Sequence, residues 1–362
     1  FIKYGQAIKG SLKGGYLLKE LKSAEDVRNF KINNQERIFH SATHEEIING
    51  GTADLYFVRT RELLAAVGKE NTDVVAEIFC SREGVLAGVE EVFNLLKHKN
   101  VSLWAVPEGE EMQQKEVIMR IKGPYDEFGM YETALLGMLA SASGWATAAR
   151  ACKEASGGVP VFSFGARHVH PAVAPVMERA SVVGGADNCS CILGAKLLGK
   201  EPTGTVPHAA VMIIGDTVET ALLYDKTMPS DSPRIILVDT FKDEAEETLR
   251  VAEALKERLS GVRLDTPGER GGVTPGLVRE IRARLDQQGF SHVQIFVSGG
   301  ITAERIPQLV EAGADAFGVG SYISSARPID MTMDLKEIDG KPVAKRGRIP
   351  GITDNPRLVC YL

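Results

Sequence analysis

The stretch "IFVSGGITAERIPQLVEAGADAFGVGS" (Ile295–Ser321) contains two short apolar runs, and each run ends in glycine and serine. The residues between the runs have the spacing of apolar and charged side chains that is typical of a helix. A strand, a helix and a second strand in this order form a parallel pair, because the helix carries the chain back to the start of the next strand. The stretch therefore predicts a βαβ unit.

The same alternation begins at Val159, where a series of short apolar runs is separated by helix-like segments such as 243–259 and 274–289. The runs that precede the quoted stretch are "VPVFSFG", "ASVVGGAD", "GTVPHAAVM", "RIILVDT" and "GVRLDT". Apolar strands that alternate with amphipathic helices indicate a parallel sheet covered by helices. We predict an α/β fold with an incomplete, about seven-stranded α/β barrel over residues 155–330. The chain has no early G-x-G-x-x-G segment, so a dinucleotide-binding fold is not favoured.

The remainder of the chain predicts a second lobe. Residues 83–99 have helical spacing, and "VSLWAVPEGEEM" and "EVIMRIKGPYDEF" are typical of strands joined by turns. Residues 1–130 are thus predicted to form an N-terminal α+β lobe, which a helix over 131–154 links to the barrel. Residues 331–362 are expected to return to the N-terminal lobe.

The composition limits the class of protein. The chain has 362 residues, of which 44% are hydrophobic and 25% charged, and this is typical of a globular protein with a sizeable core. The net charge of −6 excludes a broad basic field, so no nucleic-acid partner is expected. No signal peptide is visible, and the apolar segment 133–152 is rich in small residues, as in a buried packing helix. We expect a cytoplasmic protein with no membrane partner.

The five cysteines are scattered and form no C-x-x-C pair. This pattern is typical of free thiols in a reducing compartment, so neither disulfides nor a metal site built from Cys and His is expected.

Charged residues recur where the predicted strands end. Active sites of α/β barrels lie at the carboxyl ends of their strands. The candidates at these positions are Arg167, Asp187, His208, Asp239, Arg263 and Asp265. For several of them a structural role is an alternative, such as an ion pair between Arg263 and Asp265 or a buried core position for His208. His168 and His170 in "RHVHP" are equally consistent with a surface turn and with a function.

Glycines at the ends of the last two strands predict a phosphate site. Without a Cβ, the backbone N–H groups can approach phosphate oxygens closely. The alternative is that these glycines serve only tight turns. The candidate phosphate-binding residues are Ser298, Gly299, Gly300, Gly318, Gly320 and Ser321.

Taken in order, eight short motifs resemble those of nicotinate phosphoribosyltransferase. They are "GTADLY", "FGARHVHP", "GGADN", "GTVPHA", "LVDTF", "RLDTPG", "SGGIT" and "FGVGS". The resemblance is strongest to the compact, quinolinate-phosphoribosyltransferase-like branch of the type II phosphoribosyltransferases, and it extends from about Gly51 to Gly351. It implies an incomplete α/β barrel with a mixed N-terminal lobe, in homodimers or larger assemblies whose active sites are shared between subunits.

The resemblance also implies a reaction. Nicotinate and phosphoribosyl pyrophosphate would give nicotinate mononucleotide and pyrophosphate, with Mg²⁺ as cofactor and ATP as a co-substrate whose hydrolysis is coupled through a phosphorylated histidine. His208 resembles that histidine. Asp239, Arg263 and Asp265 resemble residues around the ribose, the pyrophosphate and the Mg²⁺ that the pyrophosphate carries, with the two aspartates as candidate metal ligands.

The same resemblance assigns the substrate contacts. Asp54 and Tyr56 resemble residues that reach across the dimer, and Tyr56 would stack on the pyridine ring. Arg167 resembles the arginine beside the ring and its carboxylate, and Asp187 a residue that faces the ring substituent. The serines and glycines named above resemble the cradle of the 5′-phosphate.

Three other functions are alternatives to this one. Quinolinate phosphoribosyltransferase binds a dicarboxylate and needs several cations, but its Thr-Arg-Lys-Thr segment is absent here and its members generally lack the Gly-Thr-x-x-His stretch. A catalytically silent, nucleotide-binding regulator on the same fold is disfavoured because the charged strand ends are retained. The glycine-rich tail alone would also fit a phosphosugar isomerase or synthase, although the earlier motifs would not. Some compact members end in a cysteine-rich zinc knuckle, which is not expected here because only Cys360 lies in the tail.

Overall fold

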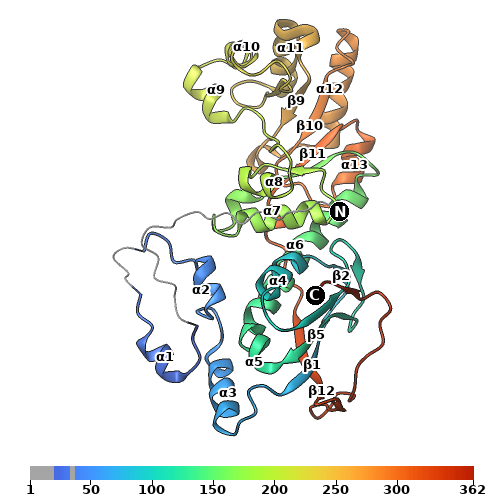
Figure 1. Ribbon diagram of the computed structural model, residues 1–362. Coiled ribbons are helices and arrows are strands. Elements are labelled where there is room, and N and C mark those ends of the chain that lie inside the picture. Colours follow the sequence, from blue (N-terminus) through green and yellow to red (C-terminus); the bar gives the residue numbers. More distant parts are fainter. Residues whose placement is uncertain (1–19, 33–36) are drawn as a thin grey trace.

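A computed structural model describes residues 20–32 and 37–362 of the chain; the first part of the predicted N-terminal lobe, residues 1–19, lies outside this range. The described chain forms two lobes, one around a parallel sheet and one around an antiparallel sheet (Figure 1). Each sheet has its own cluster of buried apolar side chains. The candidate site residues after residue 160 belong to the parallel lobe.

The parallel sheet has six described strands in the order β7-β6-β11-β10-β9-β8. They are β6 (Val161–Ser163), β7 (Asn188–Cys189), β8 (Ile235–Leu237), β9 (Gly261–Leu264), β10 (Gln294–Val297) and β11 (Ala316–Val319). Helices cover this sheet, and all four residues of the central strand β11 are buried, as is typical of a covered parallel strand. The predicted parallel α/β arrangement is confirmed.

The predicted strand count and barrel closure are not confirmed. "GTVPHAAVM" forms helix α9 (His208–Ile214) instead of a strand, and "ASVVGGAD" covers the end of helix α7 (Ala174–Val183) and the turn after it. A short apolar run does not distinguish a strand from a buried helical segment by its periodicity. In the described residues β7 and β8 lie at opposite ends of the sheet and do not pair with each other.

Helices follow most strands of this sheet and cover it (Figure 1). They include α8 (Ile192–Leu197), α10 (Thr217–Thr227), α11 (Glu244–Leu255), α12 (Pro275–Gln287), α13 (Ile306–Glu311) and α14 (Ser321–Ser324). Helix α12 illustrates their sequence logic. The Thr274 side chain caps its first turn, and Val278, Ile281 and Leu285 form the buried stripe at i, i+3 and i+7.

The antiparallel sheet has the order β13-β12-β1-β5-β3-β14. Its strands are β1 (Asp73–Cys80), β3 (Ser102–Ala105), β5 (Val117–Pro124), β12 (Met331–Ile338), β13 (Lys341–Pro342) and β14 (Val359–Cys360), and a separate pair joins β2 (Gly84–Val85) to β4 (Glu111–Met112). Strand β12 pairs with β1 and β14 pairs with β3. The last part of the chain therefore completes the sheet of the N-terminal lobe.

The long helix α6 (Glu132–Ala155) contacts both lobes. A Cβ on Gly184 would lie 2.1 Å from the carbonyl oxygen of Ala146, so glycine permits the close approach of the chain after α7 to α6. The remaining helices of the N-terminal lobe are α1 (Ala24–Asn29), α2 (His44–Ile48), α3 (Leu55–Ala66), α4 (Val89–Leu96) and α5 (Tyr125–Phe128). Within the described ranges, no helix combines the length and the apolar character that a membrane span requires.

Candidate active site

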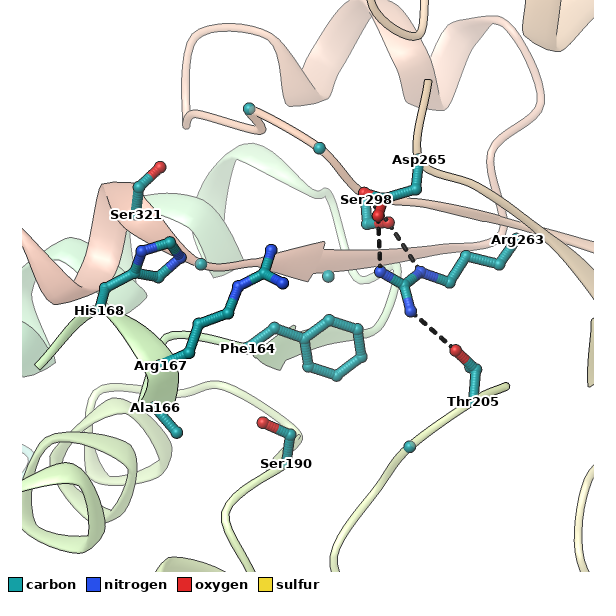
Figure 2. Close-up of a pocket in the computed structure, with 15 residues that line it drawn as sticks. Phe164, Ala166, Arg167, His168, Ser190, Thr205, Arg263, Asp265, Ser298 and Ser321 are labelled. Carbon is teal, nitrogen blue, oxygen red and sulfur yellow. Dashed lines mark hydrogen bonds and ion pairs between the residues drawn. The ribbon is translucent and has the colours of Figure 1, made fainter. Parts of the chain in front are cut away.

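A cavity of about 360 Å³ opens at the carboxyl ends of β6, β9, β10 and β11 (Figure 2). This volume is in the range of small-molecule sites. Its lining residues are Phe164, Ala166, Arg167, His168, Ser190, Gly204, Thr205, Arg263, Asp265, Ser298, Gly299, Gly300, Gly318, Gly320 and Ser321. Nine of these residues are candidates from the sequence, so the structure brings most of the predicted site together.

All six candidate phosphate-binding residues line this cavity. Gly299 and Gly300 have φ angles of +82° and +60°, a region that favours glycine. A Cβ on Gly318 would lie 2.6 Å from the Phe164 ring, and a Cβ on Gly320 would lie 3.2 Å from Nε2 of His168. The glycines therefore keep the cavity open and leave backbone exposed along one of its walls.

Arg263 on β9 is the centre of the polar network in the cavity (Figure 2). Its guanidinium donates to Thr205 Oγ1 at 2.8 Å, to Ser298 Oγ at 2.9 Å and to Asp265 Oδ2 at 3.0 Å. It also lies over the Phe164 ring, 5.5 Å from the ring centre. Ser298 Oγ donates to Asp265 Oδ1 at 2.8 Å, so the arginine, the serine and the aspartate form a closed set of contacts.

His208 and Asp239 lie close to Asp265 but are not part of the cavity lining. Nε2 of His208 is 3.8 Å from Oδ2 of both Asp239 and Asp265, and its Nδ1 is 3.0 Å from Thr240 Oγ1. His208 is the first residue of α9, and its side chain is 36% exposed. The histidine thus shares its environment with two carboxylates.

Asp239 is the most buried charge of this group. Its side chain is 1% exposed, and neither carboxylate oxygen has a hydrogen-bond partner in the described part of the chain. Burial, and secondarily the charge of Asp265, raises the pKa of Asp239 to about 6, whereas His208 opposes this shift. A buried carboxylate without a partner is uncommon, and within the described residues both oxygens of Asp239 are free to accept from a ligand.

The carboxylates of Asp239 and Asp265 could supply only part of the ligands of a metal ion. No cluster of three or more His, Cys, Asp or Glu side chains that could hold a metal ion occurs in the described residues. Mg²⁺ is commonly held by one or two carboxylates together with substrate phosphates and water. Asp239 and Asp265 fit that kind of site and not an all-protein cage.

Arg167 and His168 belong to a short 3₁₀ helix, η2 (Ala166–His168), directly after β6. Both side chains are exposed, and both line the cavity between Phe164 and Ser321 (Figure 2). His170 differs, because its Nδ1 accepts a hydrogen bond from the Ala172 N–H at 3.1 Å in a turn. Of the two histidines that the sequence left open, only His168 lines the site.

Asp187 does not reach the cavity. The predicted strand "ASVVGGAD" is absent and β7 begins only at Asn188, so Asp187 precedes the strand instead of following it. Its carboxylate accepts from the backbone N–H of Val161, the first residue of β6, and from Nζ of Lys153, both at 2.8 Å. These contacts lie at the amino end of β6, whereas the cavity lies at its carboxyl end.

Asp54 and Tyr56 lie in the N-terminal lobe, where Asp54 precedes α3 and Tyr56 is 56% exposed. The backbone N–H of Asp54 donates to Thr133 Oγ1 at 3.1 Å. Neither residue lines the cavity of its own chain. Their predicted contact with a site in a second subunit stays a prediction.

Several residues of the cavity were not candidates from the sequence. Phe164, Ser190, Gly204 and Thr205 are uncharged, so they do not stand out among strand ends. Phe164 and Thr205 do lie inside the motifs "FGARHVHP" and "GTVPHA", and their proximity to Arg167 and His208 is the signal that could have found them.

The sequence matches two family profiles. "Quinolinate phosphoribosyl transferase, N-terminal domain" covers residues 54–143, and "Quinolinate phosphoribosyl transferase, C-terminal domain" covers residues 145–334. The chain belongs to the quinolinate phosphoribosyltransferase family. The resemblance to the nicotinate phosphoribosyltransferases within this family is confirmed by its relatives.

One relative of this phosphoribosyltransferase-family chain is the nicotinate phosphoribosyltransferase pncB2 of Mycobacterium tuberculosis, which is 31% identical over 66% of this chain and 52% of that protein. The nicotinate phosphoribosyltransferase of Bacillus subtilis is 29% identical over 62% of this chain and 46% of its own length. The chain thus spans about half the length of these relatives.

Solved structures agree with the family. The nicotinate-nucleotide pyrophosphorylase of Pyrococcus furiosus is 45% identical, with a TM-score of 0.83 over 87% of this chain and 82% of that chain. Human nicotinic acid phosphoribosyltransferase has a TM-score of 0.68 over 83% and 77% of the two chains, and its 20% identity supports the fold alone.

Proposed function

We propose that this protein transfers a phosphoribosyl group from phosphoribosyl pyrophosphate to nicotinate and thereby forms nicotinate mononucleotide and pyrophosphate in NAD biosynthesis. The observation that carries the proposal is the cavity itself. It has a glycine-lined wall suited to a phosphate, the guanidinium of Arg167 suited to a carboxylate, and the Arg263–Asp265 network in the same lining.

The arrangement suits the chemistry of this reaction. As the bond between the ribose and the pyrophosphate breaks, positive charge develops on the ribose and negative charge on the leaving group. The carboxylate of Asp265 would face the ribose, while the pyridine nitrogen needs only alignment. The protein would therefore act chiefly by positioning the reactants and by electrostatic stabilisation.

Mg²⁺ is the proposed cofactor, and it would be held by Asp239 and Asp265 together with the pyrophosphate. The carboxylate of Asp239, which lacks a hydrogen-bond partner, supports this placement. When bound, the ion would neutralise charge on the leaving pyrophosphate.

The cation count of the cavity favours nicotinate over quinolinate. Arg263 is already engaged by Asp265, Ser298 and Thr205, which leaves Arg167 as the guanidinium of the lining without a protein partner in the described ranges. One free guanidinium matches the single carboxylate of nicotinate, whereas quinolinate carries two. The second candidate, quinolinate phosphoribosyltransferase, is supported by the family profiles. It is also supported by the probable nicotinate-nucleotide pyrophosphorylase [carboxylating] of Methanothermobacter thermautotrophicus, 23% identical over 73% of this chain and 89% of that protein.

The test is an assay of the purified protein with phosphoribosyl pyrophosphate, Mg²⁺ and one pyridine at a time: nicotinate, nicotinamide or quinolinate. We expect nicotinate mononucleotide, identified by its mass, to form from nicotinate. Turnover of quinolinate without turnover of nicotinate would replace the proposal with the second candidate. Absence of turnover with all three pyridines would refute the enzymatic proposal and favour the alternative of a catalytically silent, nucleotide-binding regulator.

ATP coupling through His208 is part of the proposal. The imidazole is 36% exposed and contacts both carboxylates of the proposed metal site, so a phosphoryl group on it would alter the charge beside the pyrophosphate. We expect His208→Ala to lose the stimulation by ATP but to keep a slow basal rate. His170→Ala, which removes a histidine outside the cavity, is the control. Undiminished stimulation of the His208→Ala variant by ATP would refute the assignment.

A second copy of the chain is the proposed partner. Exposed apolar side chains lie on α3 and directly after it, where Leu63 is 70% and Val67 66% exposed. Others lie on α8 and α9, where Ile192 is 70% and Ile213 85% exposed. Large exposed apolar side chains support a covered surface in an assembly. Asp54 and Tyr56 would then contribute to the site of the partner subunit.

A further inference from the structure

A buried carboxylate lies behind the wall of the cavity. Glu178 is on α7, and its side chain is completely buried. Its Oε1 accepts from the backbone N–H of Ala166 at 3.1 Å, and its Oε2 accepts from the backbone N–H of Cys191 at 2.6 Å. The hydroxyls of Ser163 and Ser190 lie 3.4 Å from the same carboxylate.

These contacts join two loops that line the cavity. Ala166 begins η2 after β6, whereas Ser190 and Cys191 lie between β7 and α8. A single side chain therefore fixes the backbone at the carboxyl ends of two neighbouring strands. Burial raises the pKa of Glu178, and the surrounding backbone N–H groups of Cys191 and Ala166 oppose the shift, as expected where donors surround a carboxylate.

The side chains carried by η2 have few other restraints. Arg167 and His168 are exposed, and neither side chain forms a hydrogen bond or an ion pair within residues 20–32 and 37–362. Their direction into the cavity, which Figure 2 shows, therefore depends on the backbone of η2. The contact between Ala166 and Glu178 anchors that backbone at its first residue.

We infer that Glu178 is a positioning residue: it holds η2 so that Arg167 meets the carboxylate of the pyridine substrate. The inference rests on the proposed function for the identity of that substrate, but the anchoring of the loop does not depend on it. Glu178 itself does not line the cavity, so it acts through Arg167.

Both carboxylate oxygens are needed for this role. Glutamine of the same size has one acceptor oxygen, and its NH₂ group cannot accept from a backbone N–H. The variant Glu178→Gln would therefore leave either Ala166 or Cys191 without its partner, and it would lose the charge that strengthens the remaining bond. Aspartate keeps the charge and both oxygens but is shorter.

The test compares Glu178→Gln with Glu247→Gln. Glu247 is an equally buried carboxylate, but it is on α11 and pairs with Arg250 away from the cavity. In Glu178→Gln we expect hydrogen exchange to quicken by about tenfold at the amides of residues 165–168 and 190–191. We also expect the KM for nicotinate to rise about tenfold with little change in kcat, because a displaced guanidinium weakens binding. In Glu247→Gln neither quantity should change, and Glu178→Asp should be intermediate in both.

A third readout does not require turnover: the Kd for nicotinate mononucleotide, measured by calorimetry, should rise in Glu178→Gln as the KM does. Unchanged exchange at these amides overturns the inference, and so does faster exchange with an unchanged Kd. An equal effect of Glu247→Gln would show a general loss of stability instead of positioning.

If the unaltered protein turns over no pyridine, the proposed function fails, while hydrogen exchange and the Kd for nicotinate mononucleotide still decide the role of Glu178. Should Glu178→Gln not fold, Glu178→Asp carries the same comparison.

Discussion

Replacing Arg263 with alanine is expected to lower kcat/KM for phosphoribosyl transfer by about a thousandfold and the free energy of unfolding by about 3–5 kcal/mol. The side chain is 16% exposed and donates to Asp265, Ser298 and Thr205. Its removal leaves a largely buried carboxylate without its cation and also removes the group that holds Asp265 in the cavity. Steady-state kinetics and urea unfolding measure the two effects.

Two further variants make this prediction specific. Arg263→Lys keeps the positive charge but not the planar group that contacts three partners at once, so its activity should fall between those of the unaltered protein and the alanine variant. Arg284→Ala removes an exposed arginine that pairs with Glu280 on α12, and its stability should change by less than about 0.5 kcal/mol with no effect on kcat/KM. An Arg263→Ala variant with unaltered kcat/KM would show that Arg263 has no role in the reaction.

Replacing Asp239 with asparagine is expected to raise the free energy of unfolding at pH 8 by about 2–3 kcal/mol and to lower activity by about a hundredfold. The folded-state pKa of Asp239 is about 6, above its value in the unfolded chain, chiefly because of burial. Because the folded protein binds this proton more tightly than the unfolded chain, protonation of Asp239 stabilises the fold. This contribution to the free energy of unfolding is fully present below the unfolded pKa and is lost as the pH rises through about 6. Asparagine stays neutral at every pH, so the variant does not lose stability in this way. It cannot supply the carboxylate that is proposed to hold Mg²⁺, so its activity falls.

The pH dependence is the decisive part of this prediction. The stability difference between Asp239→Asn and the unaltered protein should be close to zero at pH 4 and should grow up to about pH 7. Denaturant unfolding at pH 4, 6 and 8 measures it. Asp231→Asn, which changes an exposed carboxylate, should show no comparable trend. A variant that is less stable than the unaltered protein at pH 8 would show that the carboxylate of Asp239 stabilises the fold.

The sequence predicts the framework of the site well where side-chain pattern and strand position coincide. The apolar runs of β9, β10 and β11 are flanked by clear amphipathic helices. The residues within these runs or directly after them line the cavity, namely Arg263, Asp265 and the glycines at the ends of β10 and β11. His208 lies beside Asp239 and Asp265 even though it begins a helix instead of ending a strand. The motif "GTVPHA" predicts that His208 lies at the site, although its secondary structure is not the one expected.

The errors and omissions have physical causes. Asp187 was misplaced because a two-residue strand has no detectable pattern, so the sequence did not reveal on which side of β7 the aspartate lies. Glu178 resembles any acidic residue on an amphipathic helix until the loops that it joins are seen in space. Asp54 and Tyr56 do not line the cavity of their own chain, so their predicted contact with a partner subunit stays a prediction.

The central claim is that the cavity transfers a phosphoribosyl group to a pyridine with one carboxylate. A competition experiment tests it directly, with equal concentrations of nicotinate and quinolinate, limiting phosphoribosyl pyrophosphate and Mg²⁺. The measured quantities are the nicotinate mononucleotide formed and the CO₂ released, because quinolinate must lose a carboxylate to give the same product. We predict that nicotinate mononucleotide forms at the expense of nicotinate without CO₂. Release of one CO₂ for each nucleotide formed would contradict the claim.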